Sequence, residues 1–187
     1  KCLGLRRVHL VGLAVGSMIA QQLALQEPGL ICGLVLASPR SELDPRGVKY
    51  NEERADTVEA RGMRAVMDVT IERAFPPEYV RSRPEVMRQF RGEFLSNDPR
   101  SYAAVCRGLT TFGTTPRLPE IRCPTLLLAG ELDQLCPARE AAAMQSRIAG
   151  SRCEMLPGVG HFSAIEAPTQ VGERVLAFLR SLPGGGP

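Results

Sequence analysis

Val8-His9-Leu10-Val11-Gly12-Leu13-Ala14-Val15-Gly16 is the stretch that decides the fold of this chain. Its apolar start predicts a short buried strand, and residues 15–27 predict an amphipathic helix. Gly12 and Gly16 allow a strand and a helix to approach each other closely across a tight turn. The stretch therefore predicts a strand, a turn with a strained backbone centred on Ala14, and a helix.

The same turn carries the nucleophile in the Gly-x-Ser-x-Gly pattern of serine hydrolases, but alanine stands at position 14, where that pattern has serine. The N–H of Val15, at the start of the predicted helix, is expected to form half of an oxyanion hole. Ser17 does not replace the nucleophile, because three residues further on it faces away from the turn. Since alanine cannot attack a carbonyl, the chain as it stands is expected to be inactive as a serine hydrolase.

Further apolar runs predict strands at 34–37, 125–129 and 152–156, with helices from about 137 to 148 and from 168 to 182. Strands alternating with helices predict an α/β fold in which helices cover both faces of a parallel sheet. The first strand would leave an unpaired apolar edge, so we expect the N-terminal portion of the same fold to lie beside it. That portion can be cleaved from this chain, belong to a second chain, or lie outside the given sequence.

The long segment 40–119 interrupts the strand rhythm with helical patterns at 56–74 and 84–95, which predicts an inserted helical cap. For any single apolar residue of this cap, packing is favoured over lining a pocket. The predicted domains are a core of residues 1–39 and 120–182, the cap, and a flexible tail at 183–187, whose Pro-Gly-Gly-Gly-Pro sequence cannot pack into a core.

Two polar residues follow the later strands. Asp133 comes just after the third predicted strand, and His161 lies in a glycine-rich loop after the fourth. Active-site residues of parallel sheets gather at the carboxyl ends of strands, and a carboxylate that orients an imidazole must come from a neighbouring loop. We therefore predict a catalytic pair of Asp133 and His161 near the nucleophile position, Ala14. His9, inside the first strand, is interpreted as a packed side chain.

Composition narrows the class of protein. The 187 residues carry a net charge of +3 with acidic and basic residues interleaved, which indicates neither a nucleic-acid-binding surface nor a membrane-binding helix. We find no membrane-spanning or signal-like run and expect a cytoplasmic protein. No metal or cofactor is expected, because the chain has only two histidines and its six cysteines have no metal-ligand spacing. These cysteines are Cys2, Cys32, Cys106, Cys123, Cys136 and Cys153.

The chain resembles the C-terminal two thirds of an α/β-hydrolase. The resemblance rests on the turn at 8–13, on Leu34-Val35-Leu36-Ala37-Ser38-Pro39 and on the run 160–168, with the nucleophile position, the acid and the histidine in the order usual for that family. Within the family, the cap is similar to that of 3-oxoadipate enol-lactonases. The cap motifs are residues 59–63, 71–75 and 97–106. The chain departs from those enzymes at Ala74, where tryptophan is usual.

With serine at position 14, the resemblance implies hydrolysis of a small-molecule lactone or carboxylic ester. Serine would attack the carbonyl, His161 would accept its proton, and Asp133 would orient the imidazole. A dicarboxylic lactone would also need an arginine, for which the cap offers Arg61, Arg64 and Arg73.

Two alternatives stay open. The chain can be a ligand-binding relative without turnover, or a lyase that uses the histidine and the aspartate as a base. The alanine itself can be an engineered change, the mark of a natural pseudoenzyme, or part of a repurposed site.

Overall fold

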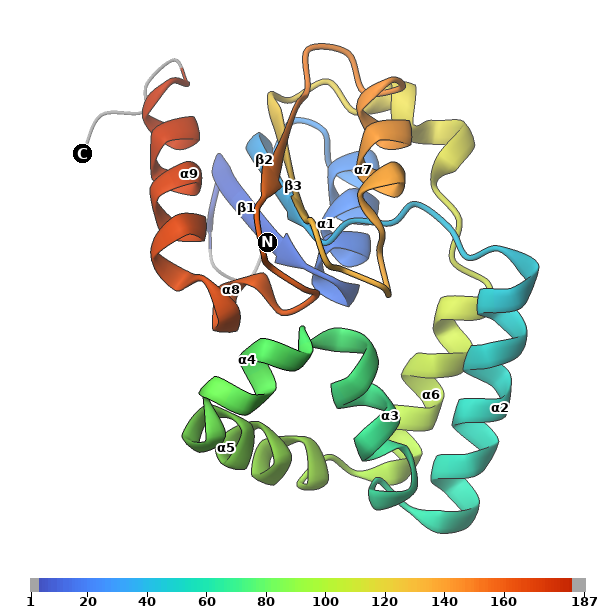
Figure 1. The fold of residues 1–187 in the computed structure, drawn as a ribbon. Helices are drawn as coiled ribbons and strands as arrows, with labels where there is room; N and C mark the ends of the chain where they lie inside the picture. Colours follow the sequence, from blue (N-terminus) through green and yellow to red (C-terminus); the bar gives the residue numbers. More distant parts are fainter. Residues whose placement is uncertain (1–3, 183–187) are drawn as a thin grey trace. The chain divides into compact units, whose positions relative to one another are not determined.

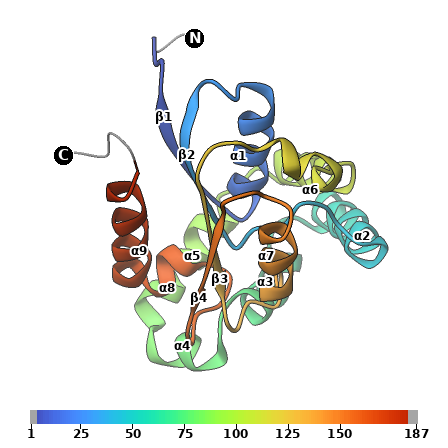
Figure 2. The same cartoon turned by 90° about the horizontal axis from the view of Figure 1, so that it is seen from above.

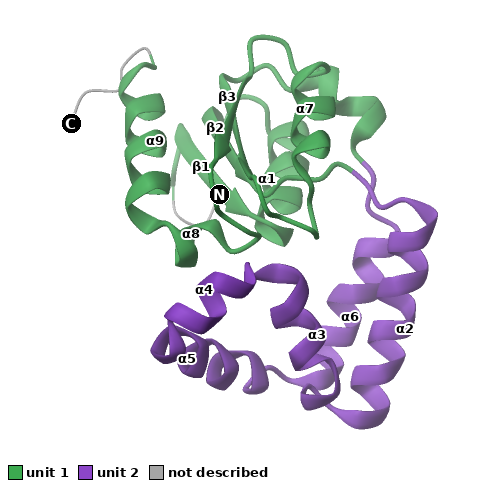
Figure 3. Cartoon of the chain, viewed as in Figure 1, with its two compact units in different colours: residues 1–41, 114–187 green, residues 42–113 purple. Residues whose placement is uncertain are grey.

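A computed structural model describes residues 4–182 of the chain, so the predicted tail at 183–187 lies outside the described residues. Two compact units form within it, residues 1–41 with 114–187 and residues 42–113 (Figure 3). The sequence placed the second boundary at residue 119, but Thr115–Glu120, a 3₁₀ turn, belongs to the first unit. The reason is Leu118, which is fully buried in the core of that unit together with Ile121.

The first unit is built on a parallel sheet of β1 (Val8–Leu13), β2 (Ile31–Ala37), β3 (Thr125–Gly130) and β4 (Arg152–Leu156) in the spatial order 1-2-3-4. Its helices are α1 (Val15–Gln26), α7 (Ala138–Gln145), α8 (Ser163–Glu166) and α9 (Pro168–Arg180). All four strands and the helices α1, α7 and α9 were predicted from the sequence, whereas α8 was not.

Alternate residues of the central strands pack on opposite faces of the sheet. Leu36 and Leu127 pack with α1 and α7 on one face, whereas Val35 and Leu128 pack with Phe178 of α9 on the other. Figure 1 and Figure 2 show the same arrangement, with α9 across the sheet from α1 and α7. Burial on both faces explains why these strands read as continuous apolar runs.

The edge strand β1 is less well covered. Val11 is 52% exposed, and Ile19, an apolar residue of the predicted amphipathic helix at 15–27, is 64% exposed. His9 is also exposed, with its Nδ1 3.5 Å from the Sγ of Cys32, so its interpretation as a packed side chain was wrong. Among the described strands β1 pairs only with β2, so its other edge has no neighbouring strand.

The second unit consists of helices only. They are α2 (Pro45–Arg61), α3 (Arg64–Ala74), α4 (Pro77–Ser82), α5 (Pro84–Leu95) and α6 (Pro99–Thr110). Asp44 and Asp98 each accept a hydrogen bond from a backbone N–H of the first helical turn, and each precedes a proline at the first helical position. The predicted helix at 56–74 is in fact two helices, because Gly62 adopts a φ of 74° and ends α2.

Arg54 holds three helices of this unit together. The side chain is buried, and its guanidinium donates to the hydroxyls of Tyr50 on α2, Thr70 on α3 and Tyr102 on α6. The distances to Tyr50 and Tyr102 are 2.8–3.0 Å. The sequence analysis missed Arg54, although its position one helical turn after Tyr50 was a usable signal.

Candidate active site

The turn between β1 and α1 has the strained backbone that the sequence predicts. Ala14 has a φ of 52° and a ψ of −116°, a conformation that L-residues rarely adopt. A Cβ on Gly12 would lie only 2.3 Å from the carbonyl oxygen of Gly16, so only glycine allows the strand and the helix to meet here. The structure therefore presents position 14 at a sharp corner directly before the first N–H groups of α1.

Backbone hydrogen bonds tie this corner to its neighbours. The N–H of Ala14 donates to the carbonyl of Ala37 at 3.0 Å, and the hydroxyl of Ser17 donates to the carbonyl of Ala14 at 2.7 Å. Ser17 is fully buried, so its hydroxyl belongs to the helix start and is not offered to a substrate. Val15 is the first residue of α1, where the N–H groups of a helix have no partner within the helix.

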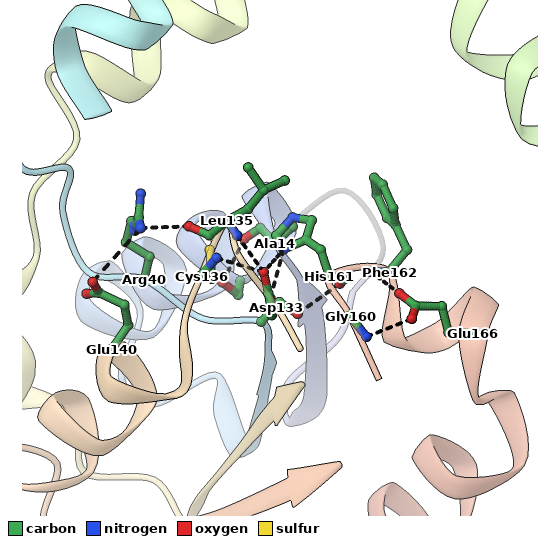
Figure 4. Close-up of polar contacts among 12 residues, drawn as sticks. Ala14, Arg40, Asp133, Leu135, Cys136, Glu140, Gly160, His161, Phe162 and Glu166 are labelled. Atoms are coloured by element: carbon green, nitrogen blue, oxygen red, sulfur yellow. Dashed lines mark hydrogen bonds and ion pairs between the residues drawn. The ribbon is translucent and has the colours of Figure 1, made fainter. Parts of the chain in front are cut away.

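Asp133 and His161 meet at the carboxyl edge of the same sheet (Figure 4). Nδ1 of His161 lies 2.9 and 3.1 Å from the two carboxylate oxygens of Asp133, and both side chains are buried. The N–H groups of Leu135 and Cys136 also donate to this carboxylate, at 2.9 and 2.8 Å. Since an ionised carboxylate only accepts, Nδ1 carries the proton and Nε2 is the nitrogen left to exchange one with a substrate.

Each member of the pair stabilises the charged form of the other. Burial alone would lower the pKa of His161, but the hydrogen bond and charge of Asp133, together with Cys136, outweigh it and raise that pKa to about 9. Burial alone would raise the pKa of Asp133, but the hydrogen bond and charge of His161 outweigh it, and that pKa lies below its ordinary value. The contacts of this pair therefore stabilise the imidazolium that forms when Nε2 of His161 accepts a proton.

Ser38 links the histidine loop to the end of β2. It follows Ala37, is fully buried, and donates from Oγ to the carbonyl oxygen of His161 at 2.9 Å. Ser38 also has a positive φ of 46°, so two strained non-glycine residues stand at the ends of neighbouring strands, Ala14 after β1 and Ser38 after β2. The sequence analysis quoted Ser38 within a motif but assigned it no role.

One group of potential metal ligands occurs among the described residues. Donor atoms of Asp133, Cys136 and His161 all lie within 4.8 Å of one another. Asp133 and His161 already hydrogen-bond to each other, so a metal ion would have to displace the proton on Nδ1. All five described cysteines, among them Cys136, are free thiols.

The arginines proposed for a dicarboxylic substrate lie in the helical unit. Arg61 ends α2 and Arg64 begins α3, and both are exposed, whereas Arg73 stacks its guanidinium 4.4 Å from the ring centre of Tyr50.

No helix in the described part of the chain is both long and apolar enough to span a bilayer.

Comparison with known proteins agrees with this geometry. The sequence pattern of the family described as "alpha/beta hydrolase fold" matches residues 1–168. The chain is 22% identical to 3-oxoadipate enol-lactonase 2 of Acinetobacter baylyi over 90% of its own length and 62% of that protein. It is 26% identical to the putative carbamate hydrolase RutD of Stutzerimonas stutzeri, over 87% of its length and 62% of the relative.

The crystal structure of an enol-lactonase from Burkholderia xenovorans superposes with a TM-score of 0.89 at 26% identity, over 96% of this chain and 68% of that one. The chain thus spans somewhat less than two thirds of the curated relatives named above, all of which are hydrolases by name. The strained corner, the Asp133–His161 pair and these matches agree, and the chain belongs to the α/β-hydrolase fold family.

Proposed function

We propose that the protein is built to hydrolyse a small lactone or carboxylic ester, and that Ala14 stands at the position of its nucleophile. The observation that carries the proposal is the 2.9 Å hydrogen bond between Nδ1 of His161 and Asp133, at the sheet edge where β1 turns at Ala14. In the variant Ala14→Ser, the serine oxygen would attack the carbonyl and pass its proton to Nε2 of His161. The N–H of Val15 would stabilise the oxyanion, and water activated by His161 would release the acid.

The Ala14→Ser variant of the full-length polypeptide tests this proposal. Hydrolysis of p-nitrophenyl acetate and of an enol-lactone is expected in this variant and not in the unchanged chain. Ala14→Ser combined with His161→Gln is the matched control and should lose at least about a hundredfold in kcat, as removal of a general base typically does. A folded Ala14→Ser variant that remains inert would refute the proposal.

The alanine itself favours a second function, binding without turnover. A fold that keeps a buried, hydrogen-bonded Asp133–His161 pair but no nucleophile can hold a small ligand at this edge. Ligand binding that is equal in the Ala14 chain and in an inert Ala14→Ser variant would support this function. Turnover by the Ala14 chain itself, lost in His161→Gln, would instead support a lyase that uses the imidazole as its base.

We also propose that the N-terminal portion of the same fold covers β1. Support comes from the exposed Val11 and Ile19 and from the pairing of β1 with β2 alone among the described strands. A neighbouring strand would protect from hydrogen exchange those amides of β1 that point away from β2. Unchanged exchange of these amides in a full-length polypeptide would refute the pairing.

The substrate preference and the location remain proposals as well. If a dicarboxylic lactone is the substrate, replacing Arg61, Arg64 or Arg73 by alanine should raise KM for the acidic substrate and leave KM for a neutral ester unchanged. We propose a cytoplasmic location on composition alone, which fractionation of the source cells would test.

A further inference from the structure

The loop that carries His161 is held by one carboxylate. Glu166, the last residue of the short helix α8, accepts a hydrogen bond from the N–H of Gly160 at 2.6 Å and another from the N–H of Phe162 at 3.0 Å (Figure 4). These two N–H groups belong to the residues on either side of His161. One side chain thus fixes the backbone both before and after the imidazole.

Another contact of the loop acts on a different atom: Ser38 donates to the carbonyl oxygen of His161, whereas the N–H groups of Gly160 and Phe162 donate to Glu166. Gly160 has no side chain and lies very close to the end of β3. A Cβ on Gly130 would lie only 2.3 Å from the carbonyl oxygen of Gly160. A buried N–H without an acceptor is destabilising, so loss of the carboxylate would favour a rearranged loop. A small rotation at His161 would be enough to spoil the 2.9 Å contact between Nδ1 and Asp133.

We propose that Glu166 is a positioning residue for His161, which sets the imidazole opposite Asp133 by clamping the two backbone N–H groups that flank it. Glu166 does not touch the reacting atoms and acts only through His161. The inference deepens the proposed function. Its test reads the imidazole directly in the Ala14 chain, so it can fail while ester hydrolysis by Ala14→Ser succeeds, and the reverse.

A purely electrostatic role is the competing explanation, because a carboxylate near an imidazolium raises its pKa without any clamp. Three variants distinguish the positioning role of Glu166 from a purely electrostatic one. Glu166→Gln removes the charge and one acceptor oxygen, whereas Glu166→Asp keeps the charge and shortens the reach. Glu131→Gln is the matched control, because Glu131 accepts a single hydrogen bond from the N–H of Gly158, at 2.8 Å, in the same loop.

The experiment is an NMR titration of the histidine ring signals, which are simple to assign because the chain has only two histidines. The unchanged protein should show a His161 pKa near 9 and a slowly exchanging Nδ1 proton. In both Glu166→Gln and Glu166→Asp that pKa should fall by about one or more, a tenfold change in the ionisation equilibrium, and the Nδ1 proton should exchange faster. Glu131→Gln should leave both readouts unchanged.

Two outcomes would overturn the proposal. An unchanged His161 pKa in both Glu166 variants would exclude positioning, and full recovery in Glu166→Asp would reduce Glu166 to a charge effect. A measurement on the unchanged protein covers the case in which the variants fail to fold. The amide protons of Gly160 and Phe162 should then be protected from exchange and shift together as one carboxyl group titrates, and independent shifts or fast exchange would refute the clamp.

Discussion

The pKa of His161 predicts how the stability of the chain depends on pH. We compare the free energy of unfolding of the unchanged chain with that of His161→Gln as the pH is raised. Because the pKa of His161 is about 9 in the folded chain and 6.5 in an unfolded one, folding binds a proton. The stabilisation is fully present below about pH 6.5 and is lost as the pH rises through about 9.

The magnitude follows from the two pKa values. At 1.36 kcal/mol for each pKa unit, the interval from 6.5 to about 9 corresponds to about 3 kcal/mol of folding free energy. About 2 kcal/mol of this should be lost between about pH 6 and about pH 8.5. At the acid end, the lowered pKa of Asp133 implies the opposite sign, with stability lost as the pH falls below about 4.

Urea unfolding at a series of pH values measures this dependence. His161→Gln should be less stable than the unchanged chain at pH 6, and the difference between the two should shrink by about 2 kcal/mol towards pH 8.5. The contributions of groups that titrate in both proteins cancel in this difference between the two free energies of unfolding. A difference that stays constant over the range, or grows with pH, would show that His161 is not held as an imidazolium by Asp133 and would refute the reasoning.

Three further predictions concern single side chains. Ala14→Gly should raise the free energy of unfolding by about 1 kcal/mol, because glycine adopts the positive φ of this corner without strain; a loss of stability in urea unfolding would contradict this. Arg54→Ala should destabilise the helical unit by about 3 kcal/mol because hydroxyls on three helices lose their shared donor, whereas the exposed Arg61→Ala should cost no more than about 0.5 kcal/mol in the same thermal or urea assay. Ser38→Ala should leave the carbonyl of His161 without its buried donor and cost about 1–2 kcal/mol, and an unchanged unfolding midpoint would show that the hydrogen bond is not important.

Local patterns of the sequence were enough to predict the sheet and the corner. The strands of a parallel sheet are buried on both faces, so β2 and β3 read as unbroken apolar runs whatever their partners. The turn at Ala14 was equally readable, because the need for glycine at position 12 is set by atoms only four residues away. Features that depend on residues close by in the sequence could therefore be predicted from it.

Features that depend on distant partners were missed or misread. Leu118 lies in the core because Ile121 and the sheet face cover it, which its local sequence does not reveal. Ile19 has the spacing of a buried residue but lies on a face that the described chain leaves open. Glu166 was quoted only as part of a motif, since its two N–H partners depend on the exact path of the histidine loop.

The contacts around position 14 indicate that a serine there would leave the rest of the site unchanged. Every hydrogen bond described for Ala14 uses its backbone: its N–H donates to Ala37, and its carbonyl accepts from the N–H and hydroxyl of Ser17 and from the N–H of Met18. His161 is held by Asp133 and by Ser38, and neither contact uses the methyl group of Ala14. Adding one oxygen atom at this Cβ therefore changes no contact that supports the fold, and the kinetics of Ala14→Ser will report on the chemistry of the site alone.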